Sequence, residues 1–319
     1  MSAVQKVNWS PTASIATLEA RAKLLATIRQ FFAERFVLEV ETPLLSHNHV
    51  TDSHIQLIPA QLIAAPGEKT ENMFLQSSPE HAMKRLLASG SGSIYQLGKV
   101  FRNQERGKRH NPEFTMLEWY RVNFSYAGIL KDVSNLVRCI GLGDSCETIT
   151  YEELFEEQLG FNPHTEELDA LRAFAKEQFD FSGSENLTRS ESLDLIFSHL
   201  IEPHLGFSQP TLVIDYPADQ SALALVEPHP SGDYSIARRF ELFVRGYELA
   251  NGYVELQDAN ILRQRWQAAG QQPDERLLAA LESGLPACSG VALGVDRCLM
   301  VLLGASHIDQ VLAFPVERA

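Results

Sequence analysis

The chain has 319 residues, of which 45% are hydrophobic and 21% charged, a composition typical of globular proteins that excludes general disorder. The 27 Lys and Arg are outnumbered by 41 Asp and Glu, giving a formal net charge of −14, which excludes a general nucleic-acid binder because phosphate contacts need a basic surface. No run approaches the roughly 20 apolar residues that span a bilayer. The N-terminus has no basic start followed by an apolar core, so we expect neither membrane insertion nor secretion. The cysteines Cys139, Cys146, Cys288 and Cys298 form no C-x-x-C pair and indicate reduced thiols in a cytoplasmic protein.

Residues 15–36 carry apolar side chains at steps of three and four, which predicts an amphipathic helix with Ser14 as its N-cap. Its expected apolar face consists of Ile15, Leu18, Ala22, Leu25, Ile28 and Phe32. A short β-rich run follows this helix and ends at Pro43.

Residues 72–90 predict a strand, a turn at Ser78 and Pro79, and a helix. Residues 93–104 and 110–124 predict two strands of a long antiparallel hairpin, and the loop between them is basic. This part of the chain therefore has strands with helices inserted between them.

Residues 125–205 are mostly acidic with helical spacing, and we interpret them as a mainly helical insertion packed on the main sheet. Strands and turns resume in residues 211–217, 239–256 and 290–297. Runs of strands with inserted helices favour an α+β class with a largely antiparallel sheet. The chain has no G-x-G-x-x-G and no G-x-x-x-x-G-K-[ST] segment, so neither a dinucleotide fold nor a P-loop is indicated.

The basic hairpin is the first segment with residues suited to chemistry. Arg102 at a strand end can donate two hydrogen bonds to a phosphate, and Phe114 can stack on a base. Glu118 and Tyr120 alternate with Trp119 and so share one face of the sheet. The loop adds positive charge from Arg106, Lys108, Arg109 and His110. Taken alone, a solvated charged hairpin explains the segment equally well.

The second segment contains Glu241, Glu248 and Glu255 at seven-residue intervals. An odd interval places strand residues on opposite faces unless a turn intervenes, and Asn251 with Gly252 predicts such a turn. Glu248 and Glu255 would then face one cleft, where carboxylates and phosphates together suit Mg²⁺. An acidic solvent face on a hairpin is the alternative.

The third segment combines Gly290 and Gly294, which leave a strand bare for a ligand, with Arg297 at the start of the next helix. A closely packed strand-to-helix junction is the alternative. A separate loop holds His47, His49 and His54, but three histidines without a nearby cysteine favour a solvated loop over a zinc site.

In order and content these segments resemble motifs 1, 2 and 3 of the class II aminoacyl-tRNA synthetases: VETPLL, FRN…HNPEFTMLEWY and GVALGVDR. The lysyl subgroup is the most similar, and the resemblance runs from about residue 15 to the C-terminus. It implies a single catalytic domain over residues 1–319, an antiparallel sheet flanked by helices, and a homodimer formed around motif 1.

Lysyl-tRNA synthetases also carry an N-terminal anticodon-binding domain, which we expect to be absent here because the predicted motif 1 helix starts near Ile15. The chain therefore resembles the ligases of this family that activate (R)-β-lysine with ATP and transfer it to a lysine side chain of elongation factor P. This resemblance implies that the partners are β-lysine or lysine and elongation factor P, with tRNA unlikely. A truncated lysyl-tRNA synthetase paralogue acting on RNA and an inactive regulatory paralogue are the alternatives.

The resemblance also implies roles for individual residues. Those expected to bind ATP are Arg102, Asn103, Gln104, His110, Asn111, Phe114, Glu248, Leu249, Gly294 and Arg297. Arg102 and Arg297 are expected to act in catalysis, and Glu241 and Glu248 to hold Mg²⁺. Those expected to bind the amino acid are Ser78, Pro79, Glu80, Glu118, Tyr120, Asn251, Tyr253, Glu255 and Ala292.

Two positions depart from the lysyl pattern. Gln104 stands where motif 2 usually has a glutamate that accepts a hydrogen bond from adenine, with Glu105 beside it, so we expect weaker but intact ATP recognition. Ala292 stands where lysyl-tRNA synthetases have glycine. Its methyl group is expected to crowd an α-amino group and to suit an amine on the β-carbon.

Overall fold

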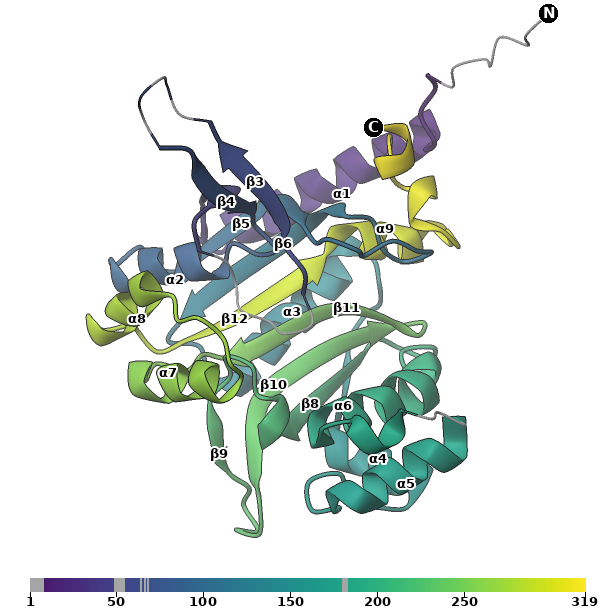
Figure 1. The fold of residues 1–319 in the computed structure, drawn as a ribbon. Coiled ribbons are helices and arrows are strands. Elements are labelled where there is room, and N and C mark those ends of the chain that lie inside the picture. Colours follow the sequence, from purple (N-terminus) through teal and green to yellow (C-terminus); the bar gives the residue numbers. More distant parts are fainter. Residues whose placement is uncertain (1–8, 49–54, 64, 66, 68, 180–182) are drawn as a thin grey trace, which may run out of the picture.

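The computed structural model describes residues 9–48, 55–63, 65, 67, 69–179 and 183–319 (Figure 1). His49 and His54 of the histidine loop lie outside these residues. The main sheet has the strand order β1-β5-β6-β12-β11-β10-β8-β7, with β9 paired to β10. Its strands are β1 (Leu38–Glu39), β5 (Ile94–Phe101), β6 (Glu113–Val122), β7 (Glu147–Thr150), β8 (Thr211–Pro217), β9 (Val226–Pro228), β10 (Ser235–Val244), β11 (Tyr247–Val254) and β12 (Cys288–Gly294).

All neighbouring strands of the main sheet are antiparallel except β1 with β5 and β7 with β8. The expected α+β class with a largely antiparallel sheet is confirmed, as is the hairpin, whose strands β5 and β6 pair from Ile94 with Tyr120 to Phe101 with Glu113. A second sheet contains β2 (Leu45–Ser46), β4 (Glu71–Leu75) and β3 (Ile58–Leu62). Its β3–β4 hairpin projects from the body (Figure 1).

Helices cover the main sheet and its ends. They are α1 (Ile15–Ala33), α2 (Glu80–Ala88), α3 (Tyr126–Ile140), α4 (Tyr151–Leu159), α5 (Leu168–Phe179), α6 (Arg189–Ile196), α7 (Ala259–Ala268), α8 (Glu275–Glu282) and α9 (Val295–Leu303). Helices α2, α7 and α8 share a core at one end, whereas α4, α5 and α6 lie together at the other (Figure 1). Within the described ranges, no helix is both long and apolar enough to cross a membrane.

Alternation along the central strands separates the core from the site. Leu117 and Trp119 of β6, with Val291 and Leu293 of β12, point into a core that also contains residues of α1, α3 and α9. Because successive strand residues face opposite sides, the intervening residues of both strands face away from this core. That second face holds the cleft described below.

Helix α1 begins after Ser14, whose hydroxyl accepts a hydrogen bond from the Thr17 amide, so the predicted cap is confirmed. The predicted apolar face is only partly right. Ile15 and Ala22 are exposed, whereas the residues of α1 that are buried are Leu24, Ile28, Phe31 and Phe32. In the first turns of the helix Leu18 is half-buried and Ala20 packs against the core, whereas Ile15 remains exposed.

The expected helical insertion over residues 125–205 contains parts with different surroundings. Helix α3 contributes Ile129 and Val133 to the main core, and β7 joins the main sheet beside β8. Helices α4 to α6 instead surround a separate aromatic cluster built around Tyr151 and Phe155. That these residues act as one inserted unit stays a prediction.

Candidate active site

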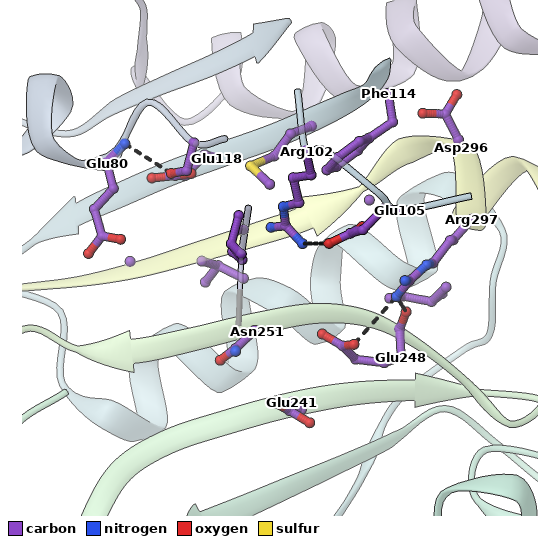
Figure 2. A pocket seen from close by; sticks show the side chains of 18 of the residues that line it. Glu80, Arg102, Glu105, Phe114, Glu118, Glu241, Glu248, Asn251, Asp296 and Arg297 are labelled. Carbon is purple, nitrogen blue, oxygen red and sulfur yellow. Dashed lines mark hydrogen bonds and ion pairs between the residues drawn. The ribbon is translucent and has the colours of Figure 1, made fainter. Parts of the chain in front are cut away.

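A cleft of ≈ 390 Å³ opens on the face of the main sheet away from α1 and α3. Its lining has two chemically different parts (Figure 2). Arg102, Arg297 and Phe114 lie toward the start of α9 together with Glu105 and Glu248, whereas Glu80 and Glu118 lie toward α2. The expected site residues that line it are Ser78, Glu80, Arg102, His110, Asn111, Phe114, Glu118, Tyr120, Glu241, Glu248, Leu249, Asn251, Tyr253, Glu255, Ala292, Gly294 and Arg297.

Strand register brings these residues together from distant parts of the chain. One row across β6, β12, β11 and β10 contains Glu118, Ala292, Asn251 and Glu241. The next row contains Tyr120, Gly290, Tyr253 and Arg239. Residues paired across neighbouring strands have side chains on the same face, so the two rows form the floor of the cleft.

The predicted turn at Asn251 and Gly252 is wrong. Strand β11 continues through both residues, and the turn lies at Arg245 and Gly246, between β10 and β11. Gly252 is required for close packing instead, because a Cβ there would overlap the Phe240 ring and the carbonyl of the opposite strand.

A β-bulge produces the change of face that the turn was expected to supply. Leu242 pairs with Ala250 and Phe243 pairs with Glu248, so Leu249 is the extra residue. A bulge moves the residues beyond it out of the regular alternation. Glu248 therefore lines the same cleft as Asn251 although the two are an odd number of positions, three, apart.

Arg102 lies between Glu105 and Phe114 at the end of the cleft nearest the start of α9. Its Nη1 lies 3.6 Å from Glu105 Oε1, and its guanidinium carbon lies 5.2 Å from the ring centroid of Phe114. Gln104 and Asn103 are exposed and do not line the cleft. Gln104 has a positive φ of 62°, and this turn of the backbone places Glu105, rather than Gln104, in the cleft wall. Glu105, which follows Gln104 in the sequence, is thus the residue whose carboxylate is available in the cleft wall.

Arg297, in the first turn of α9, meets His110 and Glu248. Its Nη2 lies 2.6 Å from His110 Nε2, and its Nη1 donates to the Glu248 carbonyl at 2.9 Å. Glu248 Oε2 lies 3.4 Å from the same nitrogen. Burial and the charge of Arg297 lower the pKa of His110, so the imidazole is neutral at neutral pH and can accept from the guanidinium.

Asp296, next to Arg297, fixes the start of α9. Its Oδ2 accepts from the Thr115 amide of β6 at 2.6 Å, and its Oδ1 forms an ion pair with Arg21 of α1. Asp296 is buried, and a buried carboxylate needs such partners. The position of Arg297 is thereby tied to both β6 and α1.

The two carboxylates expected to bind a metal are both present, with different partners. Glu241 is buried, accepts from the Tyr216 hydroxyl at 2.8 Å and pairs with Arg239. Burial raises the pKa of Glu241 against the opposing charge of Arg239. Among the described residues, no group of three or more His, Cys, Asp or Glu side chains is placed to hold a metal. Two hard carboxylates fit Mg²⁺ when phosphates complete its shell.

Glu118 lies at the other end of the cleft with two hydroxyl donors. The Tyr120 hydroxyl donates to its Oε1 and the Ser78 hydroxyl to its Oε2, each at 2.7 Å. Burial and the nearby charge of Glu80 raise the pKa of Glu118 to about 8, although both hydrogen bonds favour the ionised form. A bound cation would restore its charge at neutral pH.

Glu80 and Glu255 complete this acidic end, and Lys84 joins them. The Lys84 Nζ lies 2.7 Å from Glu80 Oε1 and 2.6 Å from Glu255 Oε2. The sequence reasoning missed Lys84, because a lysine four residues after a glutamate on a helix usually forms an exposed pair. Pro79, expected to bind the amino acid, is the N-cap residue of α2 and does not line the cleft.

Gly290 has a packing role in the cleft floor. A Cβ there would overlap Glu255 Oε1 and the Tyr120 ring. A bare strand was expected to admit a ligand, but at this position the space is filled by the chain's own side chains. At Gly294 an added Cβ would meet nothing closer than 3.9 Å, so that glycine does leave open space.

The sheet, the placement of Arg297 at the start of α9 and the cleft define a class II synthetase catalytic fold. The chain belongs to the family of class II tRNA synthetases (D, K and N), which matches residues 7–318. Within it, the elongation factor P–(R)-β-lysine ligase of Pasteurella multocida (strain Pm70) is 45% identical over 325 residues, 99% of this chain and 99% of its own.

Two further relatives carry the same name. The ligase of Vibrio cholerae serotype O1 (strain ATCC 39315 / El Tor Inaba N16961) is 46% identical over 324 residues, 98% of this chain and 99% of its own. That of Haemophilus ducreyi (strain 35000HP / ATCC 700724) is 45% identical over 327 residues, 98% of each chain. The similarity therefore covers both ends of the cleft.

Proposed function

We propose that this protein is an ATP-dependent ligase that adenylates (R)-β-lysine, or lysine, and transfers it to a lysine side chain of elongation factor P. The observation that carries the proposal is a cleft that joins an arginine-rich end to a buried acidic end, in a chain similar to such ligases over nearly its whole length. We further propose that the protein acts in the cytoplasm and does not use tRNA.

The acidic end suits a diamino acid. Glu80, Glu118 and Glu255 approach one another from α2, β6 and the end of β11. Ammonium groups taken out of water need carboxylate partners, and a substrate with two ammonium groups satisfies more of these carboxylates than one with a single amine. Tyr120 and Asn251 add polar contacts beside them.

The arginine-rich end suits ATP. Phe114 and Arg297 are proposed to sandwich the adenine, and Glu105 to accept from its amino group. Arg102 is proposed to bind the α-phosphate through its fork of donors. His110, which is neutral, and Asn111 line the same end. Among these residues Arg102 and Arg297 are the proposed catalytic pair.

The reaction follows from this arrangement in two steps. A carboxylate oxygen of the amino acid attacks the α-phosphorus of ATP, the bond to the β-phosphate oxygen breaks, and pyrophosphate leaves. Arg102 and Arg297 stabilise the negative charge that builds up on the phosphates. A neutral lysine amine of the protein substrate then attacks the acyl carbonyl, AMP leaves, and the amine releases a proton to solvent. Correct positioning supplies much of the acceleration.

Glu241 and Glu248 are the residues that we propose to hold Mg²⁺. When bound, Mg²⁺ supplies positive charge beside the phosphates. Arg239 and Tyr216 hold the Glu241 carboxylate in place from below the cleft.

We also propose a homodimer formed around α1 and the run that ends at Pro43. Phe36 is 95% exposed, and Leu38 and Leu44 are exposed beside it in sequence. Exposed large apolar residues gathered in one region are typical of interfaces.

Exchange of labelled pyrophosphate into ATP, driven by β-lysine or by lysine, tests the first step. Mass spectrometry of elongation factor P after incubation with the enzyme, ATP and β-lysine tests the second. Charging of tRNA instead of the protein would favour the RNA-directed alternative. Absence of exchange with every diamino acid would favour an inactive regulatory protein.

A further inference from the structure

Lys84 is a buried cation next to the amino-acid end of the cleft. Only 2% of its side chain is exposed, and it does not line the cleft. Its ammonium joins Glu80, one turn earlier on α2, to Glu255, which follows β11. Any effect of Lys84 on a ligand must therefore act through these carboxylates.

The helix holds Lys84 firmly in this position. Its neighbours Met83 and Leu87 are fully buried in the core shared by α2, α7 and α8. On the opposite side, Glu255 packs against Gly290 so closely that a Cβ there would overlap its Oε1. The Lys84 ammonium and the Glu80 carboxylate are therefore held by α2, and the Glu255 carboxylate by the chain that follows β11.

The charges around this point do not balance within the protein. Glu80, Glu118 and Glu255 supply three negative charges when ionised, and Lys84 supplies one positive charge. Among the described residues, the other titratable groups that face them are Tyr120 of β6, Tyr253 of β11, Cys288 of β12 and, beyond Tyr253, Arg239 of β10, which pairs with Glu241. Within this part of the chain two negative charges remain unmatched, and a diammonium ligand supplies two positive charges.

We propose that Lys84 is a positioning residue that orients Glu80 and Glu255 and sets the charge of the amino-acid chamber to match a substrate with two ammonium groups. This role rests on the proposed function and identifies what selects the substrate class. Lys84 contacts neither substrate nor ATP in this assignment. It acts by keeping Glu255 ionised and both carboxylates in place.

The pKa values agree with this role. Burial raises the pKa of Glu255, the charge of Lys84 opposes that rise, and the net pKa is about 7. Burial lowers the pKa of Lys84, but the charges of Glu255 and Glu80 outweigh it and the net pKa is raised. Without Lys84, the pKa of Glu255 should rise further, and each unit of rise costs about tenfold in its ionised fraction at neutral pH.

The test compares Lys84→Met with the wild-type enzyme in pyrophosphate exchange, from about pH 6 to about pH 9. At neutral pH we expect the KM for the diamino acid to rise at least about tenfold, whereas the KM for ATP stays nearly unchanged. The increase in this KM should shrink as pH rises, because Glu255 then ionises without the help of Lys84. Calorimetry in two buffers should show that the variant releases more protons on binding lysine.

Two variants of the same helix serve as controls. Leu87→Ala removes a buried side chain from α2 without touching an ionisable group, so it should lower stability and leave the pH profile of the KM unchanged. Lys84→Arg keeps the charge and should keep the wild-type pH profile. The proposal would be overturned if Lys84→Met raised the KM for the diamino acid by the same factor at every pH. It would also be overturned if the KM for ATP rose as much as the KM for the amino acid.

The wild-type enzyme supplies a test that does not depend on folding of the variant. It should bind 6-aminohexanoate, which has one ammonium group, at least about tenfold more weakly than lysine. Equal binding of the two would overturn the role of Lys84 and leave the ligase proposal standing. Failure of the wild type to bind or activate any diamino acid would overturn both.

Discussion

Replacing Ala292 with glycine tests the choice between α- and β-amino acids. Ala292 lies in the middle of β12, paired with Glu118 on one side and Asn251 on the other. Its neighbours Val291 and Leu293 point into the main core, so its methyl group faces the cleft. The methyl thus occupies space in the floor between the acidic end and the phosphate end.

The size of the effect follows from the cost of overpacking. Fitting an additional methylene-sized group into filled space typically costs about 1–3 kcal/mol, which corresponds to roughly a ten- to hundredfold preference. An α-ammonium group lies next to the reacting carboxylate and needs this space, whereas an amine on the β-carbon does not. Ala292→Gly should therefore raise kcat/KM for α-lysine and erode the preference for β-lysine.

The assay is pyrophosphate exchange with each amino acid. It reports on the amino-acid pocket alone, because the protein substrate takes no part in adenylation. Ala250→Gly is the matched control, since Ala250 lies on the neighbouring strand and is buried in the main core. Both variants place a glycine in a strand, which should lower the free energy of unfolding by about 0.5–1 kcal/mol. A wild type that already prefers α-lysine, with a ratio that Ala292→Gly leaves unchanged, would refute the reasoning.

Three further predictions concern the metal, pH and assembly. Glu248→Gln should abolish exchange and leave the melting temperature nearly unchanged, whereas near-normal exchange would remove Glu248 from the metal site. Because the pKa of Glu118 is raised to about 8 and a cation binds its ionised form, affinity for the diamino acid should increase about tenfold per pH unit between about 7, the pKa of Glu255, and about 8, and level off above that. Glu118→Gln should weaken binding and flatten this part of the profile, and a profile retained in the variant would assign the titration to another group. Light scattering should show a dimer at micromolar concentration, and a monomer would contradict an interface around Phe36.

Alternation of side chains made the floor of the cleft predictable. Glu118 and Tyr120 were expected on one face of their strand with Trp119 on the other, and the structure has them so: the Tyr120 hydroxyl donates to Glu118, and Trp119 is in the core. The strand, turn and helix over residues 72–90 were predictable for a similar reason, since Ser78 and Pro79 interrupt two regular periods.

Other features depend on contacts that local sequence does not contain. The bulge at Leu249 arises from pairing with β10, and no residue type in this segment predicts it. Lys84 is distinguished from a surface lysine only by Glu255, which reaches it from a distant strand. Glu105, rather than Gln104, lies in the cleft wall because the backbone of Gln104 is left-handed. Glutamine does not favour this conformation, so the sequence does not predict it.

The bulge at Leu249 has a consequence for how this site tolerates insertions and deletions. It divides β11 into two registers, with Glu248 before it and Asn251, Tyr253 and Glu255 after it. Deleting Leu249 would give a more regular ladder with β10, yet it would turn Glu248 away from the cleft or shift every later residue to the opposite face. A deletion that makes the backbone pairing more regular would thus separate the phosphate end from the amine end and remove a buried side chain of the main core, so the bulge serves both the site and the core.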